Sequence, residues 1–130
     1  MSQEFKVEIV NPDKSFLSKE DIIEAVVPAF EGEMGILKDH ISIISFLKPG
    51  VIKIFSKSGE ENYYVEDGIV EFKNNSLSVL TSYIFDISSL DKDKIRELLT
   101  QAEEYSKNSE ITDQNRYLVD QKIDVLKTLN

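Results

Sequence analysis

EGEMGILKDHISIISFLKPGVIKI, residues 31–54, alternates apolar and polar residues along most of its length. A strand points successive side chains to opposite faces of a sheet, so this alternation is typical of a strand with one buried face. The stretch also holds three of the chain's five glycines and its only histidine, His40. Because glycine and proline favour turns, we predict that Gly35, Pro49 and Gly50 shape turns between short strands.

The same period of two continues on both sides of this stretch. Near the N-terminus, Phe5, Val7 and Ile9 alternate with polar residues, and further along Asp67-Gly68 is a hairpin-turn signal. We predict strands at residues 5–10, 21–27, 41–46, 51–55, 62–65, 69–72 and 77–80. Many short strands with no helix between them predict an antiparallel β-sandwich or a flattened barrel.

The period of the apolar residues becomes helical near residue 88. Helix start signals occur at Asp91 and at Thr112, and a polar loop separates the two helical segments. The first apolar stripe is Ile95, Leu98, Leu99 and Ala102, and the second is Val119, Ile123 and Leu126. We therefore predict a mainly β fold with a C-terminal α part: a β-sandwich domain over residues 1–88 and an antiparallel two-helix hairpin over residues 89–130.

Composition and charge narrow the classes of function. The 130-residue chain has 24 acidic and 15 basic residues, and its net charge of -9 has the wrong sign for binding nucleic acid or an anionic lipid surface. Most of the excess acid lies in residues 1–88, so a charged partner of this part would be basic. The chain has no cysteine for a disulfide or a zinc–thiolate site, and we see no signal-peptide pattern or long apolar run.

Three residues are candidates for chemistry or binding. His40 could act as a base or metal ligand, but the chain offers no second histidine or cysteine, so we expect no metal site and favour an interface side chain. Glu31 and Glu33 flank Gly32 and would project to the same side of an extended segment. They could form an acidic knob for a basic partner, or a small active site if they converge with His40 in one pocket.

Two ordered groups of residues resemble the epsilon subunit of bacterial F-type ATP synthase, whose mitochondrial counterpart is called delta. The first group is Glu31-Gly32-Glu33-Met34-Gly35, then His40, then Leu47-Lys48-Pro49-Gly50, and the second is Asp67-Gly68-Ile69-Val70-Glu71-Phe72 followed by Leu77-Ser78-Val79-Leu80. The resemblance implies a ten-stranded β-sandwich with a two-helix domain. It also implies a non-catalytic subunit of the central stalk, which binds the gamma subunit and the c-ring and transmits proton-driven rotation to the catalytic head.

The resemblance also assigns roles to individual residues. It makes Glu31, Gly32 and Glu33 the loop that contacts the c-ring, places His40 near the interface with gamma and the c-ring, and makes Gly68 a turn residue. It implies a location at the cytoplasmic face of the bacterial inner membrane, with the membrane reached only through the complex. The family's Pro-Gly before the histidine is Lys38-Asp39 here.

The helical part carries two further expectations from the resemblance. Many members begin the first helix with an (I/L)DxxRA motif associated with ATP, which Asp91 and Lys94 match only in part because lysine replaces arginine. A weak nucleotide site at these two residues is the only ligand expected. The hairpin of relatives can also reach the catalytic-head alpha and beta subunits and inhibit ATP hydrolysis. The alternative is an acidic β-sandwich that binds a protein outside any rotary complex.

Overall fold

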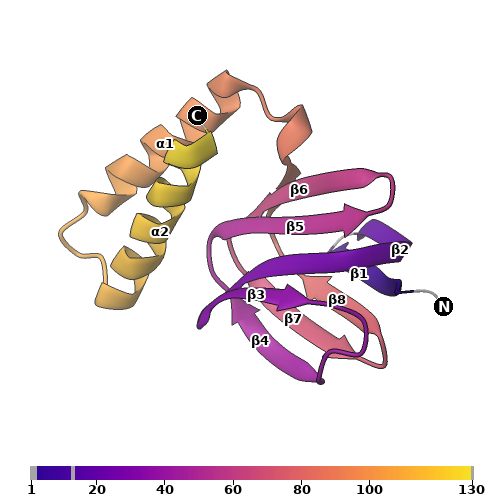
Figure 1. The fold of residues 1–130 in the computed structure, drawn as a ribbon. Helices are drawn as coiled ribbons and strands as arrows, with labels where there is room; N and C mark the ends of the chain where they lie inside the picture. Colours follow the sequence, from indigo (N-terminus) through magenta and orange to yellow (C-terminus); the bar gives the residue numbers. More distant parts are fainter. Residues whose placement is uncertain (1–2, 13, 130) are drawn as a thin grey trace.

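The computed structural model describes residues 3–12 and 14–129 and contains a β-sandwich followed by a helical hairpin (Figure 1). Its elements are β1 (Phe5–Asn11), β2 (Lys14–Ala29), β3 (Gly32–Ile36), β4 (Ile43–Leu47), β5 (Gly50–Ser56), β6 (Gly59–Val65), β7 (Gly68–Lys73), β8 (Ser76–Leu80), β9 (Ile84–Asp86), the 3-10 helix η1 (Ile87–Ser89), α1 (Lys92–Ser106) and α2 (Asp113–Leu129). The predicted fold class is confirmed, with nine strands in the described ranges against about ten expected.

The strands follow the path β1-β8-β7-β4-β2-β5-β6-β9, and β3 pairs with β2. All pairs are antiparallel except β1 and β8, and β1 also pairs with β2. Strand β2 is 16 residues long: its first part pairs with β1, and its last part pairs with β3 and β5. One strand thus contributes to both layers of the sandwich, which lowers the strand count.

Alternate residues of the strands fill the core between the layers. The fully buried apolar side chains include Val7, Ile9, Ile22, Val27, Ile36, Ile52, Val65, Val70 and Leu77. Their neighbours along each strand face outward, as the period of two predicts.

The helical hairpin packs against one end of the sandwich through a second, smaller cluster. Tyr64 of β6 is fully buried there with Leu98 of α1 and Leu126 of α2. Beside the cluster, the Glu66 carboxylate accepts a hydrogen bond from the Tyr64 hydroxyl at 2.8 Å and pairs with the Lys122 ammonium at 2.9 Å. None of the described helices has the length and apolar character needed to cross a membrane.

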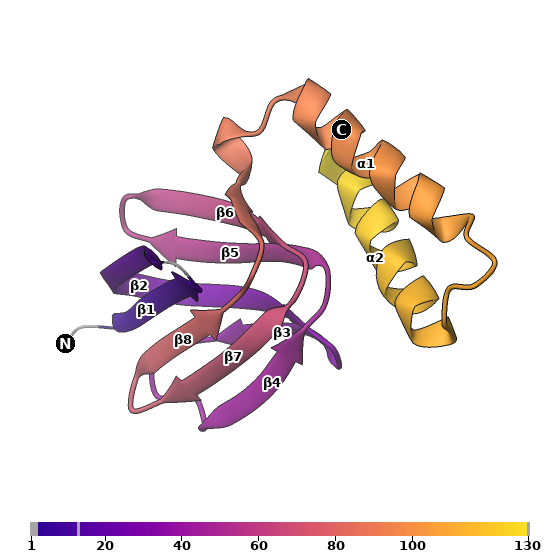
Figure 2. The same cartoon turned by 180° about the vertical axis from the view of Figure 1, so that it is seen from behind.

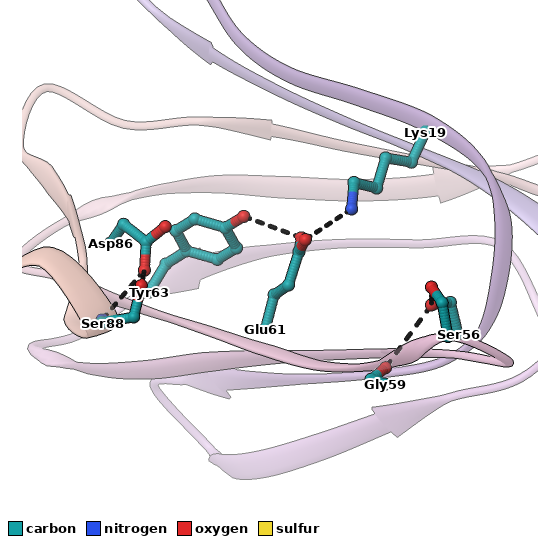
Figure 3. A network of polar contacts seen from close by, with 8 residues as sticks. Lys19, Ser56, Gly59, Glu61, Tyr63, Asp86 and Ser88 are labelled. Atoms are coloured by element: carbon teal, nitrogen blue, oxygen red, sulfur yellow. Dashed lines mark hydrogen bonds and ion pairs between the residues drawn. The ribbon is translucent and has the colours of Figure 1, made fainter.

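A polar network connects β2 to β6 along the side of the sandwich (Figure 3). The Glu61 carboxylate accepts hydrogen bonds from the Lys19 ammonium at 2.6 Å and from the Tyr63 hydroxyl at 2.9 Å. The Lys19 ammonium lowers the pKa of Glu61, and the Tyr63 hydroxyl bond lowers it further. A carboxyl whose pKa is lowered by folding stabilises the fold above its unfolded pKa and loses that contribution as the pH falls.

We therefore expect Lys19→Met to make thermal stability less dependent on pH. Wild type should lose the contribution of the pair as the pH falls below about 5, where an unfolded glutamate begins to take up protons. Because both side chains are partly exposed, the difference at pH 7 should be no more than about 1 kcal/mol. Melting temperatures of both proteins at pH 7 and pH 4 measure this. Equal drops in both would contradict the assigned role of Lys19.

Candidate interaction surfaces

The segment Glu31–Glu33 forms the turn from β2 to β3 and the start of β3. Phe30 and Glu31 occupy the turn, and Gly32 pairs with Ala29 in a backbone conformation with φ of 133°, which favours glycine. The Ser45 hydroxyl donates a 2.9 Å hydrogen bond to the Glu31 carboxylate. The pKa of Glu31 is lowered by a hydrogen bond from its own backbone N–H and by this serine bond.

Glu33 has different surroundings from Glu31. It is exposed and lines an open cavity of about 530 Å³ between the sandwich and α2, together with Lys48, Lys53 and Asp124. The two glutamates therefore do not form the single acidic pair that an extended segment predicts. Glu31 lies in the turn and its side chain bonds to Ser45 of β4, whereas Glu33 lies in β3.

His40 lies in the loop before β4, which sits against the turn between β7 and β8. Its ring packs edge-on against Phe72 at 5.7 Å between centroids, and its Nδ1 donates to the Ile41 carbonyl oxygen at 2.6 Å. Asp39 adopts the left-handed conformation with φ of 67°, and its N–H donates to the Asn75 side-chain oxygen at 2.6 Å. Asp39 thus adopts a backbone conformation that glycine usually adopts, and its hydrogen bond to Asn75 fixes the loop that carries His40.

The structure places Glu31, Glu33 and His40 in different surroundings. The cavity that Glu33 lines has neither Glu31 nor His40 in its wall, and each of these two is engaged with a different neighbour. Acid–base catalysis needs its groups within hydrogen-bond reach of one substrate, so this arrangement does not support the enzyme alternative.

Three of the four predicted turn residues lie at strand connections, and one does not. Pro49 forms the bend before β5, Gly50 begins β5, and Gly68 begins β7 with φ of 147°. Gly35 instead lies within β3 and pairs with Val26, so its prediction as a turn residue is wrong. The alternation of exposed and buried residues continues through Gly35, and a strand accommodates it without a turn.

The two residues of the expected nucleotide site both have structural partners. The Asp91 carboxylate caps α1 by accepting a hydrogen bond from the Lys94 N–H at 2.7 Å. The Lys94 ammonium lies 5.6 Å from the centre of the Phe85 ring, a distance typical of a cation–π contact. Both side chains therefore already have a role within the fold.

The outer face of β1, β8, β7 and β4 carries an apolar row that the sequence reasoning missed. Strand pairing aligns Val10, Leu80, Ile69 and Phe46 across the four strands. Figure 2 shows β8, β7 and β4 side by side. Phe46 is 61% exposed, Leu80 49% and Ile69 42%, and a shallow cavity of about 270 Å³ lies along the row. Contiguous exposed apolar side chains of this kind mark interaction sites.

The family model, the curated relatives and the solved structures that this chain resembles all come from ATP synthases. Residues 4–86 match the family model of the ATP synthase delta/epsilon chain β-sandwich domain. The ATP synthase epsilon chain of Pelagibacter ubique is 86% identical over 130 residues, the full length of both chains. The ATP synthase epsilon chain of Dichelobacter nodosus is 38% identical over 83% of this chain and 76% of its own. A chain of the Euglena gracilis mitochondrial ATP synthase has a similar fold, with a TM-score of 0.76 and 18% identity over 99% of this chain and 80% of its own.

Proposed function

This chain belongs to the ATP synthase delta/epsilon family, non-catalytic subunits of the central stalk, and on that premise we propose that it couples the c-ring to the catalytic head by binding the gamma subunit. The observation that supports this proposal is the apolar row of Phe46, Ile69, Leu80 and Val10, in which all but Val10 are exposed. A subunit that transmits torque must hold its partner through a surface that does not slip. An apolar row crossing four paired strands offers a rigid surface for that contact.

We expect the double variant Phe46→Asp, Leu80→Asp to lose the complex with gamma. Each change places a charge where an apolar contact would be buried, and a buried unpaired charge opposes association strongly. The measurement is co-purification of the full-length chain with its native gamma subunit, scored by size-exclusion chromatography. A weakening of about 100-fold or more corresponds to the loss of about 3 kcal/mol.

The matched control is Tyr117→Asp, which adds a charge at a 45% exposed aromatic residue on α2, away from the row. This variant should bind gamma as wild type does. Binding of gamma by the double variant would exclude the row as the docking site. Failure of wild type to bind gamma would instead favour an acidic interaction module outside a rotary complex.

The segment Glu31–Glu33, at the β2–β3 turn and the start of β3, contacts the c-ring in this proposal. The exposed Glu33 carboxylate suits a polar or basic loop, since complementary charge sets the register of an interface. Glu33→Lys should therefore retain gamma in co-purification but lose the c-ring.

The position of His40 in a loop held to the β7–β8 turn suits an interface role in the same rotor. The complex then holds the chain at the cytoplasmic face of the bacterial inner membrane.

The hairpin restrains ATP hydrolysis when it leaves the sandwich and reaches the catalytic head. The contact around Tyr64, Leu98 and Leu126 supports this part of the proposal. Among the described residues, its three buried and six partly buried apolar side chains form a cluster separate from the main core, so the hairpin can be released while the sandwich stays folded. Only Arg116, Lys122 and Lys127 are basic in α2, and Lys122 is already paired with Glu66. An unchanged ATPase rate in a reconstituted complex that lacks residues 88–130 would exclude the restraint.

A further inference from the structure

The apolar row is one of three parallel rows on the same outer face. The second row lies two residues from the apolar row on each strand, where strand pairing aligns Glu8, Ser78, Glu71 and Ile44. Two residues further, it aligns Lys6, Ser76 and Lys73. Residues two apart on a strand point to the same face, so all three rows face away from the core. The face thus changes from apolar to acidic to basic along the strands.

The four charged residues have a regular arrangement. Glu8 and Glu71 flank Ser78, and Lys6 and Lys73 flank Ser76, so like charges are about 10 Å apart across one intervening strand. Opposite charges on one strand have Cα atoms about 7 Å apart, a distance that long side chains can bridge if they lean toward each other. Among the described residues, none of the four makes an ion pair or a side-chain hydrogen bond.

We propose that these charged rows fix the orientation in which the gamma subunit docks on the apolar row. The inference rests on the proposed function and adds the chemistry of the partner surface: an apolar ridge, then basic residues facing Glu8 and Glu71, then acidic residues facing Lys6 and Lys73. An apolar row alone would accept a partner in either direction along the strands. Charge rows of opposite sign make one direction favourable and the reverse direction repulsive.

The arrangement does not follow from the overall acidity of the chain. A chain with a net charge of -9 needs no pair of lysines beside its docking face for solubility. Lys6 and Lys73 come from strands that are not neighbours, yet both pair with Ser76 of β8. The small serines at the centre of both charged rows leave space between the charged side chains that a partner surface can fill.

The test is a variant with inverted rows: Lys6→Glu, Glu8→Lys, Glu71→Lys and Lys73→Glu. It keeps the net charge and the composition, and it keeps opposite charges adjacent on each strand, so its fold should be retained. Binding of the native gamma subunit should weaken about 10- to 100-fold because like charges face each other. Raising the NaCl concentration should weaken the wild-type complex and strengthen that of the inverted variant, since salt screens both attraction and repulsion.

Asp120→Lys with Lys127→Asp is the matched control, because it exchanges exposed charges on α2 without changing net charge, and it should bind as wild type does. Glu8→Gln with Glu71→Gln removes the acidic row alone and should weaken binding about 3- to 10-fold even if the inverted variant does not fold. Binding within twofold of wild type in the row variants would overturn the inference and leave the apolar docking site intact. Retention of gamma by Phe46→Asp, Leu80→Asp would overturn the docking site itself.

Discussion

Alanine at Gly68 should destabilise the sandwich by about 2 to 6 kcal/mol, because two separate costs combine at this position. Its φ of 147° is a conformation that side chains rarely adopt, and a Cβ there would lie 2.5 Å from the Leu80 carbonyl oxygen. That oxygen belongs to the backbone of β8, so a local side-chain movement cannot relieve the contact. The expected loss is a large part of the stability of an ordinary domain.

Substitutions at two other glycines measure the conformational cost and the packing cost separately. Gly59 has nearly the same φ, 141°, and a Cβ there would meet open space, so Gly59→Ala should show conformational strain alone, about 1 to 3 kcal/mol. Gly50 lacks a left-handed φ, but a Cβ there would lie 2.5 Å from the Pro28 Cβ. Gly50→Ala should therefore show overpacking alone, about 1 to 3 kcal/mol.

Urea unfolding of the three variants, followed by circular dichroism because the chain has no tryptophan, measures these losses. The loss for Gly68→Ala should approach the sum of the losses for Gly59→Ala and Gly50→Ala. If Gly68→Ala costs no more than Gly59→Ala, the strands at β7 and β8 relax around the methyl group, and the close approach of Gly68 to Leu80 is not a constraint on the fold.

Most strands could be predicted from the sequence because their inward residues alternate with polar ones. The predicted strands at 5–10, 51–55 and 69–72 match β1, β5 and β7 to within a residue at each end. Strand β3 was missed because Gly32 and Gly35 indicate turns, although Met34 and Ile36 already have the period of two. The first half of β2 was missed because its pairing with β1 depends on bulges, which local periodicity does not reveal.

The docking face could not be predicted from alternation because its strand β4 is apolar on both sides. In β4, Ile43 and Leu47 face inward while Ile44 and Phe46 face outward. Apolar residues in both phases indicate that both faces of a strand are covered, and this signal was available in the sequence. The aligned rows of charge could not be predicted from the sequence. They depend on which strands are neighbours, and β1 and β8 are far apart in the chain.

Alanine at Leu126 should release the helical hairpin from the sandwich without unfolding the sandwich. Leu126 is fully buried in the cluster with Tyr64 and Leu98, which is separate from the main core. Removing a buried leucine side chain costs about 2 to 5 kcal/mol, which is comparable to what so small a contact can supply. Two short helices are only marginally stable in water once their apolar stripes no longer pack against the sandwich.

Amide hydrogen exchange of the full-length chain measures this release. Protection in α1 and α2 should fall about 30-fold or more, while β1, β5 and β7 keep theirs. Lys127→Ala is the matched control, since Lys127 is the exposed neighbour of Leu126 in the same helix. A parallel loss of protection in helices and strands would show instead that the two parts unfold as one unit.

The same variant distinguishes the two roles that a released hairpin can have. If the hairpin restrains hydrolysis after release, Leu126→Ala should lower the ATPase rate of a reconstituted complex, because it shifts the population toward the released state. If the hairpin only braces the sandwich, exchange should still rise in α1 and α2 while the ATPase rate stays at the wild-type value. Hydrogen exchange therefore tests the docking contact, and the ATPase rate tests its regulatory use independently.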